Sequence, residues 1–100
     1  MKEVMTNSNG TTMTVIRGKD SIRDLDVLQE MVGGWITIVT IRTPKLFPVG
    51  TQLIVDEEGD LKNLEPNSAA TAVYQTSGRH RPGMPIVGNA VVLTEGAQIT

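Results

Sequence analysis

The sequence predicts a small single-domain α+β protein with the element order β-α-β-β-α-β and both helices packed on one face of the sheet. Three observations lead to this fold class. The chain has 100 residues, enough for one hydrophobic core and too few for two. Four stretches have the β-branched composition or the alternation of strands. Two further stretches, which separate these strands, begin with helix-capping residues and continue with helix-compatible ones.

Four segments are expected to form the strands, and they cover residues 13–18, 35–42, 51–56 and 86–94. The second, WITIVTIR, has β-branched residues on both faces. We therefore expect it to lie inside the sheet or to be covered on both sides. Gly88 and Asn89 interrupt the last strand, which predicts a bulge or a close backbone approach at that point.

The first helix is predicted over residues 21–32. Ser21 is placed to cap it, Asp24 completes a capping box, and the apolar residues recur on one face. Gly33 and Gly34 follow the last apolar residue and are expected to end the helix.

The second helix is predicted in the alanine-rich stretch NSAATAVYQTS, residues 67–77. Asn67 or Ser68 is expected to be its N-cap, because either side chain can accept a hydrogen bond from a free amide of the first turn.

Residues 1–12 are expected to form a flexible N-terminal tail. They are polar and turn-forming, with Asn7, Ser8, Asn9 and Gly10 in succession, and they offer little apolar surface to bury. The remaining residues, 13–100, are expected to form the single α+β domain.

Composition and charge exclude several classes of protein. Nine basic and eleven acidic residues give a net charge of −2, which disfavours general nucleic-acid binding. The chain has no cysteine, and therefore no disulfide, no thiolate nucleophile and no cysteine-based metal site. No apolar run approaches the roughly 20 residues that cross a membrane, so we expect a cytoplasmic protein without a membrane partner. With only three aromatic residues the core is modest, which favours a homo-oligomer.

Three ordered blocks, LQEMVGGWITIV, LIVDEEGDLKNLEPNSAAT and IVGNAVVL, carry a family resemblance. They are similar to successive signatures of the domain of unknown function 3846, which is found in bacteriophages and in bacterial genomes rich in mobile elements. The resemblance covers roughly residues 25–94. It implies a phage-type protein without implying a function. The family features fall on a glycine pair, an acidic turn and an Asn-x-x-Ala-Thr segment: Gly33, Gly34, Glu57, Glu58, Gly59, Asn67, Ala70 and Thr71.

The acidic residues after the third strand raise the question of a metal site. Five carboxylates between residues 56 and 65 accompany a single lysine, Lys62. In an EF-hand loop the glycine is sixth, so Gly59 would place Ile54 first, and an isoleucine cannot bind calcium. A solvated turn explains the residues better, and no metal or cofactor is expected.

Arg79, His80 and Arg81 are the candidate anion-binding residues. Two neighbouring guanidiniums can each bind a phosphate through two hydrogen bonds, and the glycines nearby let the backbone approach a ligand. A solvated loop that binds nothing explains the same residues. His80 is a poor general base, because neighbouring positive charge lowers its proton affinity and no adjacent carboxylate orients it. The sequence also lacks the common hydrolase, P-loop and zinc-protease motifs, so we do not expect an enzyme.

Five further residues are ligand-binding candidates, each with a structural alternative. Trp35 is expected in the core or on a sheet face, with a stacking platform for a base as the alternative, and Tyr74 offers a similar ring. Asn67 is expected to cap the second helix. Together with Ser68 and Thr71 it also forms a candidate anion seat at the helix N-terminus.

Two functions follow as expectations. In the first, a phage-type accessory protein sequesters a small phosphorylated ligand, such as a nucleotide immune signal, at a subunit junction lined by the Arg-His-Arg segment, Trp35 or Tyr74. In the second, the protein is an interaction module or inhibitor that binds a host or phage protein through a sheet edge or an apolar face.

Overall fold

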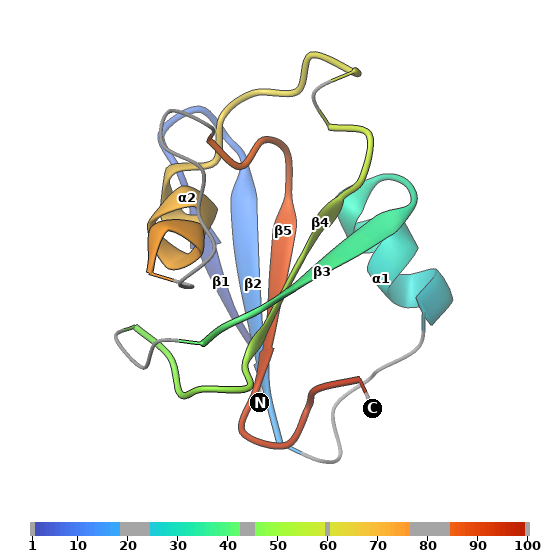
Figure 1. Ribbon diagram of the computed structural model, residues 1–100. Coiled ribbons are helices and arrows are strands. Elements are labelled where there is room, and N and C mark those ends of the chain that lie inside the picture. The colour runs from blue at the N-terminus through green and yellow to red at the C-terminus, as the bar shows by residue number, and fades with distance from the viewer. Residues whose placement is uncertain (1, 19–24, 43–45, 60, 77–84, 100) are drawn as a thin grey trace.

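The computed structural model describes residues 2–18, 25–42, 46–59, 61–76 and 85–99, and it confirms the α+β class (Figure 1). Within these residues, a five-stranded sheet packs with two helices. In chain order the elements are β1 (Lys2–Thr6), β2 (Thr12–Arg17), α1 (Leu25–Val32), β3 (Ile36–Thr40), β4 (Gln52–Asp56), α2 (Ser68–Gln75) and β5 (Ala90–Thr94).

The sheet is mixed, with the strand order β1-β2-β5-β4-β3. The central strands β2 and β5 are parallel, and the other three neighbouring pairs are antiparallel. β5 is the middle strand of the five, and all of its residues are buried. A continuous apolar run such as AVVL is typical of a strand that is covered on both faces.

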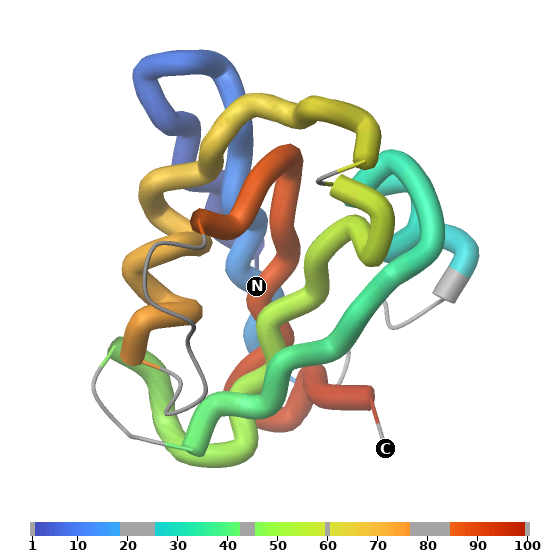
Figure 2. Tube along the Cα trace, turned by 45° about the horizontal axis from the view of Figure 1, so that its top comes forward, coloured from blue at the N-terminus to red at the C-terminus, as the bar shows by residue number. Residues whose placement is uncertain are grey.

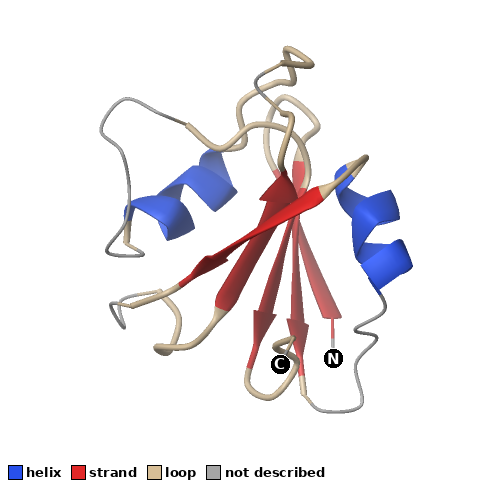
Figure 3. Ribbon diagram, turned by 45° about the vertical axis from the view of Figure 1, so that its right-hand side comes forward, coloured by secondary structure: helices blue, strands red, loops and turns tan. Residues whose placement is uncertain are grey.

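The two helices cover opposite faces of the sheet, so the prediction that both pack on one face is wrong (Figure 3). Successive strand residues point to alternate faces, and both sets are apolar in the central strands. Val92 and Leu53 face α2, where they share a cluster with Val73. Val91 and Ile54 belong to a second cluster that includes residues of α1. A sheet with two apolar faces needs cover on both, which one layer of helices cannot supply.

β3 is an edge strand, so the expectation that residues 35–42 lie inside the sheet is wrong, and the alternative, cover on both sides, holds only in part. Val39 and Ile36 pack partly against the two clusters, one on each face. Ile38 is 42% exposed, and Trp35, which precedes the strand, is 63% exposed. The core position expected for Trp35 is therefore wrong as well.

The first residues form a β-hairpin instead of the expected tail. β1 pairs with β2 from Lys2 opposite Ile16 to Thr6 opposite Thr12, although all five β1 side chains are exposed. The turn is closed by a hydrogen bond from the Gly10 amide to the Asn7 carbonyl (3.0 Å), with Gly10 at φ +89°. Backbone pairing with a buried strand holds this segment, which composition alone does not reveal.

The helix ends follow local signals. The Gly33 and Gly34 amides both donate to the Gln29 carbonyl, and Gly33 has φ +92°, so the glycine pair ends α1 as predicted. The caps predicted at Ser21 and Asp24 lie outside the described residues. Among the helices that are described, none has the length and apolar character needed to span a membrane.

Candidate functional site

Asn67 is fully buried and uses its side chain to join three parts of the fold. Its Oδ1 accepts from the Ala70 amide (3.0 Å), which confirms the predicted N-cap of α2. Its Nδ2 donates to the Thr12 carbonyl (2.9 Å) at the start of β2 and to the Gly88 carbonyl (2.8 Å) before β5. One amide thus fixes the helix, the hairpin and the segment that enters the central strand. We call this group, with the Asn7 and Thr71 contacts described next, the amide junction.

Asn7 belongs to the same junction, and sequence reasoning missed it. Its Nδ2 donates to Asn67 Oδ1 (2.7 Å) and its Oδ1 accepts from the Ala69 amide (3.1 Å). Asn9, two residues on, donates to the Pro66 carbonyl (2.6 Å), so the hairpin turn lies against the segment that leads into α2 (Figure 2). The run Asn7-Ser8-Asn9-Gly10 does indicate a turn, but nothing local indicates that its side chains cap a helix 60 residues away.

Thr71 ties α2 to the chain that returns toward β5. Its hydroxyl donates to the Asn67 carbonyl (2.7 Å) and accepts from the Ile86 amide (2.9 Å). Ala70 between them is completely buried. Each of the three defined positions of the Asn-x-x-Ala-Thr segment therefore stabilises the fold, through a helix cap, a buried side chain and a hydrogen bond to the chain before β5.

The same contacts occupy the helix end that was a candidate anion seat. The amides of Ala69, Ala70 and Thr71 donate to Asn7 Oδ1, Asn67 Oδ1 and the Asn67 carbonyl. Ser68 is exposed beside them. An anion at this end of α2 would have to displace oxygen atoms that the protein itself supplies.

The structure does not gather the other ligand-binding candidates into one site. Tyr74 is on α2 and packs partly against the cluster on that face. Trp35 belongs to the turn between α1 and β3. This turn and α2 lie on opposite sides of the molecule (Figures 1 and 3). Arg79, His80 and Arg81 lie outside the described residues, between Thr76 at the end of α2 and Pro85.

The acidic turn after β4 contains an ion pair. Asp56, whose side chain is 1% exposed, accepts from Lys62 Nζ (2.8 Å) and from the Glu58 amide (2.8 Å). Lys62 also donates to the Gly33 carbonyl (3.1 Å). A Cβ on Gly34 would lie 2.5 Å from Lys62 Nζ, so the glycine pair of the family pattern leaves room for this contact. Within the described residues, no three His, Cys, Asp or Glu side chains are close enough together to hold a metal.

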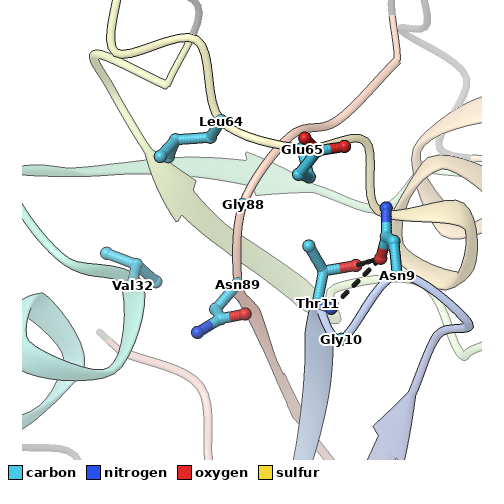
Figure 4. A pocket seen from close by; sticks show the side chains of 8 residues that line it. All are labelled: Asn9, Gly10, Thr11, Val32, Leu64, Glu65, Gly88 and Asn89. Atoms are coloured by element: carbon cyan, nitrogen blue, oxygen red, sulfur yellow. Dashed lines mark hydrogen bonds between the residues drawn. The ribbon is translucent and has the colours of Figure 1, made fainter.

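A pocket of about 320 Å³ opens between the hairpin turn, the end of α1 and the segments around Leu64 and Gly88 (Figure 4). Val32 and Leu64 lie on one side of the Gly88 backbone. The hairpin residues lie on the other side, where Asn9 Oδ1 accepts from both the amide and the hydroxyl of Thr11. Asn89 and Glu65 complete the polar part of the lining.

Gly88 shapes this pocket by lacking a side chain. It has φ +76°, and a Cβ there would meet Leu64 Cδ1 at 2.7 Å. The close approach predicted at this point is thus confirmed for Gly88, but Gly88 and Asn89 precede β5 (Ala90–Thr94) and do not interrupt a strand that begins at residue 86. Asn89 uses its Oδ1 to accept from the Thr12 amide (3.0 Å), which fixes its side chain at the edge of the pocket.

These features define a class first: a small α+β domain whose mixed sheet lies between two helices and which has a buried amide junction beside an open pocket. Within that class, the chain belongs to the family described as a domain of unknown function (DUF3846), whose model matches residues 1–100. The resemblance seen in the sequence is confirmed, and the match includes the N-terminal hairpin. No curated protein and no solved structure matches the chain.

Proposed function

We propose that this protein is a non-catalytic binding protein that captures a small phosphorylated molecule, such as a nucleotide signal. In the phage setting that the family resemblance implies, it would act in the host cytoplasm and sequester an immune signal. The observation that carries the proposal is the pocket of about 320 Å³, a volume at the lower end of those that hold small ligands.

The pocket suits the uncharged part of such a ligand. Val32 and Leu64 offer an apolar wall, and Asn9, Thr11 and Asn89 offer neutral polar groups. Glu65 is exposed at the pocket and carries a carboxylate, which accepts hydrogen bonds from hydroxyl or amino groups such as those of a ribose or a base. A phosphate would be repelled by this carboxylate and needs a different partner.

We assign the phosphate to Arg79 and Arg81, with His80 between them. No lysine or arginine is among the described residues that line the pocket. The segment that carries these cations leads into Ile86, which Thr71 holds, and two residues later into Gly88 at the pocket. A ligand with a nucleoside part and a phosphate part would use both regions.

Calorimetric titration with matched ligands tests whether the pocket binds the nucleoside part and the two arginines bind the phosphate. A cyclic dinucleotide and ADP-ribose should bind, and the corresponding nucleosides should bind more weakly. Removing both guanidiniums in the Arg79→Ala/Arg81→Ala variant should weaken binding of the phosphorylated ligands by about 100-fold or more, because charge-assisted hydrogen bonds are lost. Nucleoside binding should not change.

The pocket has its own variant and control. Glu65→Gln should weaken nucleoside binding by about tenfold, and it should weaken binding of the phosphorylated ligands less, because it also removes a charge that repels their phosphate. Glu58→Gln removes an exposed carboxylate that does not line the pocket, and should have no effect. Equal affinities for all variants, or no binding across the panel, would refute the proposal.

The second candidate function is binding of a host or phage protein, favoured by two exposed apolar side chains on adjoining turns. Trp35 is 63% exposed and Leu61 is 81% exposed. Their turns are joined by hydrogen bonds from the Glu57 amide to the Trp35 carbonyl (2.8 Å) and from Lys62 Nζ to the Gly33 carbonyl (3.1 Å). Exposed tryptophan is enriched at the centres of protein interfaces.

Quantitative affinity purification from expressing cells tests this candidate. A partner bound through these turns should be lost with Trp35→Ser/Leu61→Ser and retained with Val49→Ser, which changes a residue of similar exposure elsewhere (59%). If wild type, Trp35→Ser/Leu61→Ser and Val49→Ser all retain the same proteins, this candidate function is wrong.

A further inference from the structure

The two edges of the sheet differ in how they are protected. β1 and β3 are the outer strands (Figure 1). β1 carries Lys2 and Glu3, whereas β3 (Ile36–Thr40) carries no charge at all and exposes Ile38. An uncharged, β-branched edge strand is a template for pairing with another strand, and natural sheets usually guard against this with charges.

We propose that β3 pairs antiparallel with β3 of a second copy of this chain, across a two-fold axis at Ile38, so that the two sheets become one. This inference is independent of the proposed ligand. Two features of the chain favour a second copy of β3, and not a strand of another protein, as the partner of this edge.

The first feature is the self-complementary register. With Ile38 opposite the partner's Ile38, Thr37 lies opposite the partner's Val39 and Ile36 opposite the partner's Thr40. Every opposed pair is uncharged, and every member is β-branched, as favoured in cross-strand pairs. Directly opposed residues share a face, so the partly exposed Ile38 is covered by its own counterpart.

The second feature is charge at the two ends of β3. The acidic turn with the exposed Glu57 and Glu58 adjoins the beginning of β3, through the Glu57 amide bond to Trp35. The exposed Arg42 follows the end of β3. An antiparallel pair brings Arg42 of each copy toward the acidic turn of the other. A parallel pair would place like charges together at each end.

The symmetry also favours this arrangement. Pairing of β3 with itself is isologous and closes at a dimer, whereas pairing of β3 with β1 of another copy is heterologous and could extend without limit. Lys2 and Glu3 on β1 oppose the second arrangement, because they would face uncharged β3 residues.

Sedimentation velocity over a range of concentrations tests the dimer. The wild-type chain should form a dimer, and Ile38→Lys should weaken the dimer at least tenfold by setting two ammonium groups face to face. Val4→Lys is the matched control, since Val4 is an exposed residue (55%) in the middle of the other edge strand, and it should leave the dimer intact. Thermal unfolding followed by circular dichroism verifies that both variants fold.

Cysteine crosslinking tests the register. The chain contains no cysteine, so Ile38→Cys introduces a single thiol. Opposed Cβ atoms in antiparallel strands lie about 4.5–5.5 Å apart, close enough for a disulfide with small adjustment. We expect Ile38→Cys to crosslink under mild oxidation and Thr40→Cys not to. A monomeric wild type, a dimer that survives Ile38→Lys or is lost in Val4→Lys, or equal crosslinking at both positions would overturn the proposal.

Discussion

The amide junction around Asn67 and the ion pair of Asp56 with Lys62 both serve features of the family pattern, but they are built on opposite principles. The junction uses neutral groups to join segments up to 62 residues apart, and its centre is completely buried. The ion pair joins residues six apart, and its lysine is 37% exposed. A buried contact between distant segments leaves a buried group without a partner when one atom changes, whereas in a local contact with one exposed partner water can replace that partner.

The largest effect is expected for Asn67→Asp. This change keeps an oxygen for the Ala70 amide but replaces the Nδ2 donor by an oxygen that faces the Thr12 and Gly88 carbonyls. We expect the free energy of unfolding to fall by at least about 3 kcal/mol, because an unpaired charge is placed in a fully buried site. Urea unfolding measures it.

Ser68→Ala is the control for this change. Ser68 is the exposed neighbour of Asn67 at the same helix end, and its loss should alter stability by no more than about 0.5 kcal/mol. If Asn67→Asp were as mild as Ser68→Ala, the junction would not hold the fold in the way described.

The next effect in size is expected for Asn7→Ala. It removes the acceptor of the Ala69 amide and one of the two donors to Asn67 Oδ1, while all contacts made by Asn67 Nδ2 remain. We expect a loss of about 1–2 kcal/mol, as for removal of a helix cap.

Ser8→Ala, at an exposed position in the same turn, should leave stability unchanged and serves as the control for Asn7→Ala. Hydrogen exchange at Ala69 provides a second measurement. Its amide should lose protection in Asn7→Ala, and unchanged protection would contradict the role given to Asn7.

The contrast between the two regions also separates what could be predicted from the sequence from what could not. The cap at Asn67, the stop at Gly33 and the close approach at Gly88 depend on neighbouring residues, and all three were predicted. Their positions are readable because a cap or a positive φ is a local requirement.

Long-range relations were the ones that failed. The hairpin strand Lys2–Thr6 is held by backbone pairing, which polar composition does not exclude. The edge position of β3 depends on strand order, and a strand with two apolar faces reads the same at an edge as in the centre. For the site, Asn67 and Thr71 were identified as candidates but their partners Asn7 and Ile86 were not, because each partner comes from a distant segment.

A smaller effect is expected in the turn, for Lys62→Met. The methionine keeps the apolar stem and removes the ammonium, leaving Asp56 with the Glu58 amide. The Asp56 side chain is 1% exposed, but the Lys62 side chain beside it is 37% exposed, so water can take the place of the ammonium, and we expect a loss of about 1 kcal/mol. The difference from wild type should shrink as salt is raised. A salt-independent loss as large as that of Asn67→Asp would remove the distinction between the two regions.

The smallest effect is expected for Gly34→Ala, and it measures the coupling within the turn. The added Cβ would lie 2.5 Å from Lys62 Nζ and 3.3 Å from Asp56 Oδ2, so the flexible lysine must move away from its partners. We expect a loss of roughly 0.5–1 kcal/mol in the wild-type chain. In a Lys62→Ala background the ammonium is absent, and Gly34→Ala should leave the free energy of unfolding nearly unchanged. The remaining contact with Asp56 Oδ2 costs little, and alanine offsets it by restricting the unfolded chain. A double-mutant cycle in urea compares the two backgrounds. Equal losses in both would mean that Gly34 serves the backbone of the turn and not the ion pair.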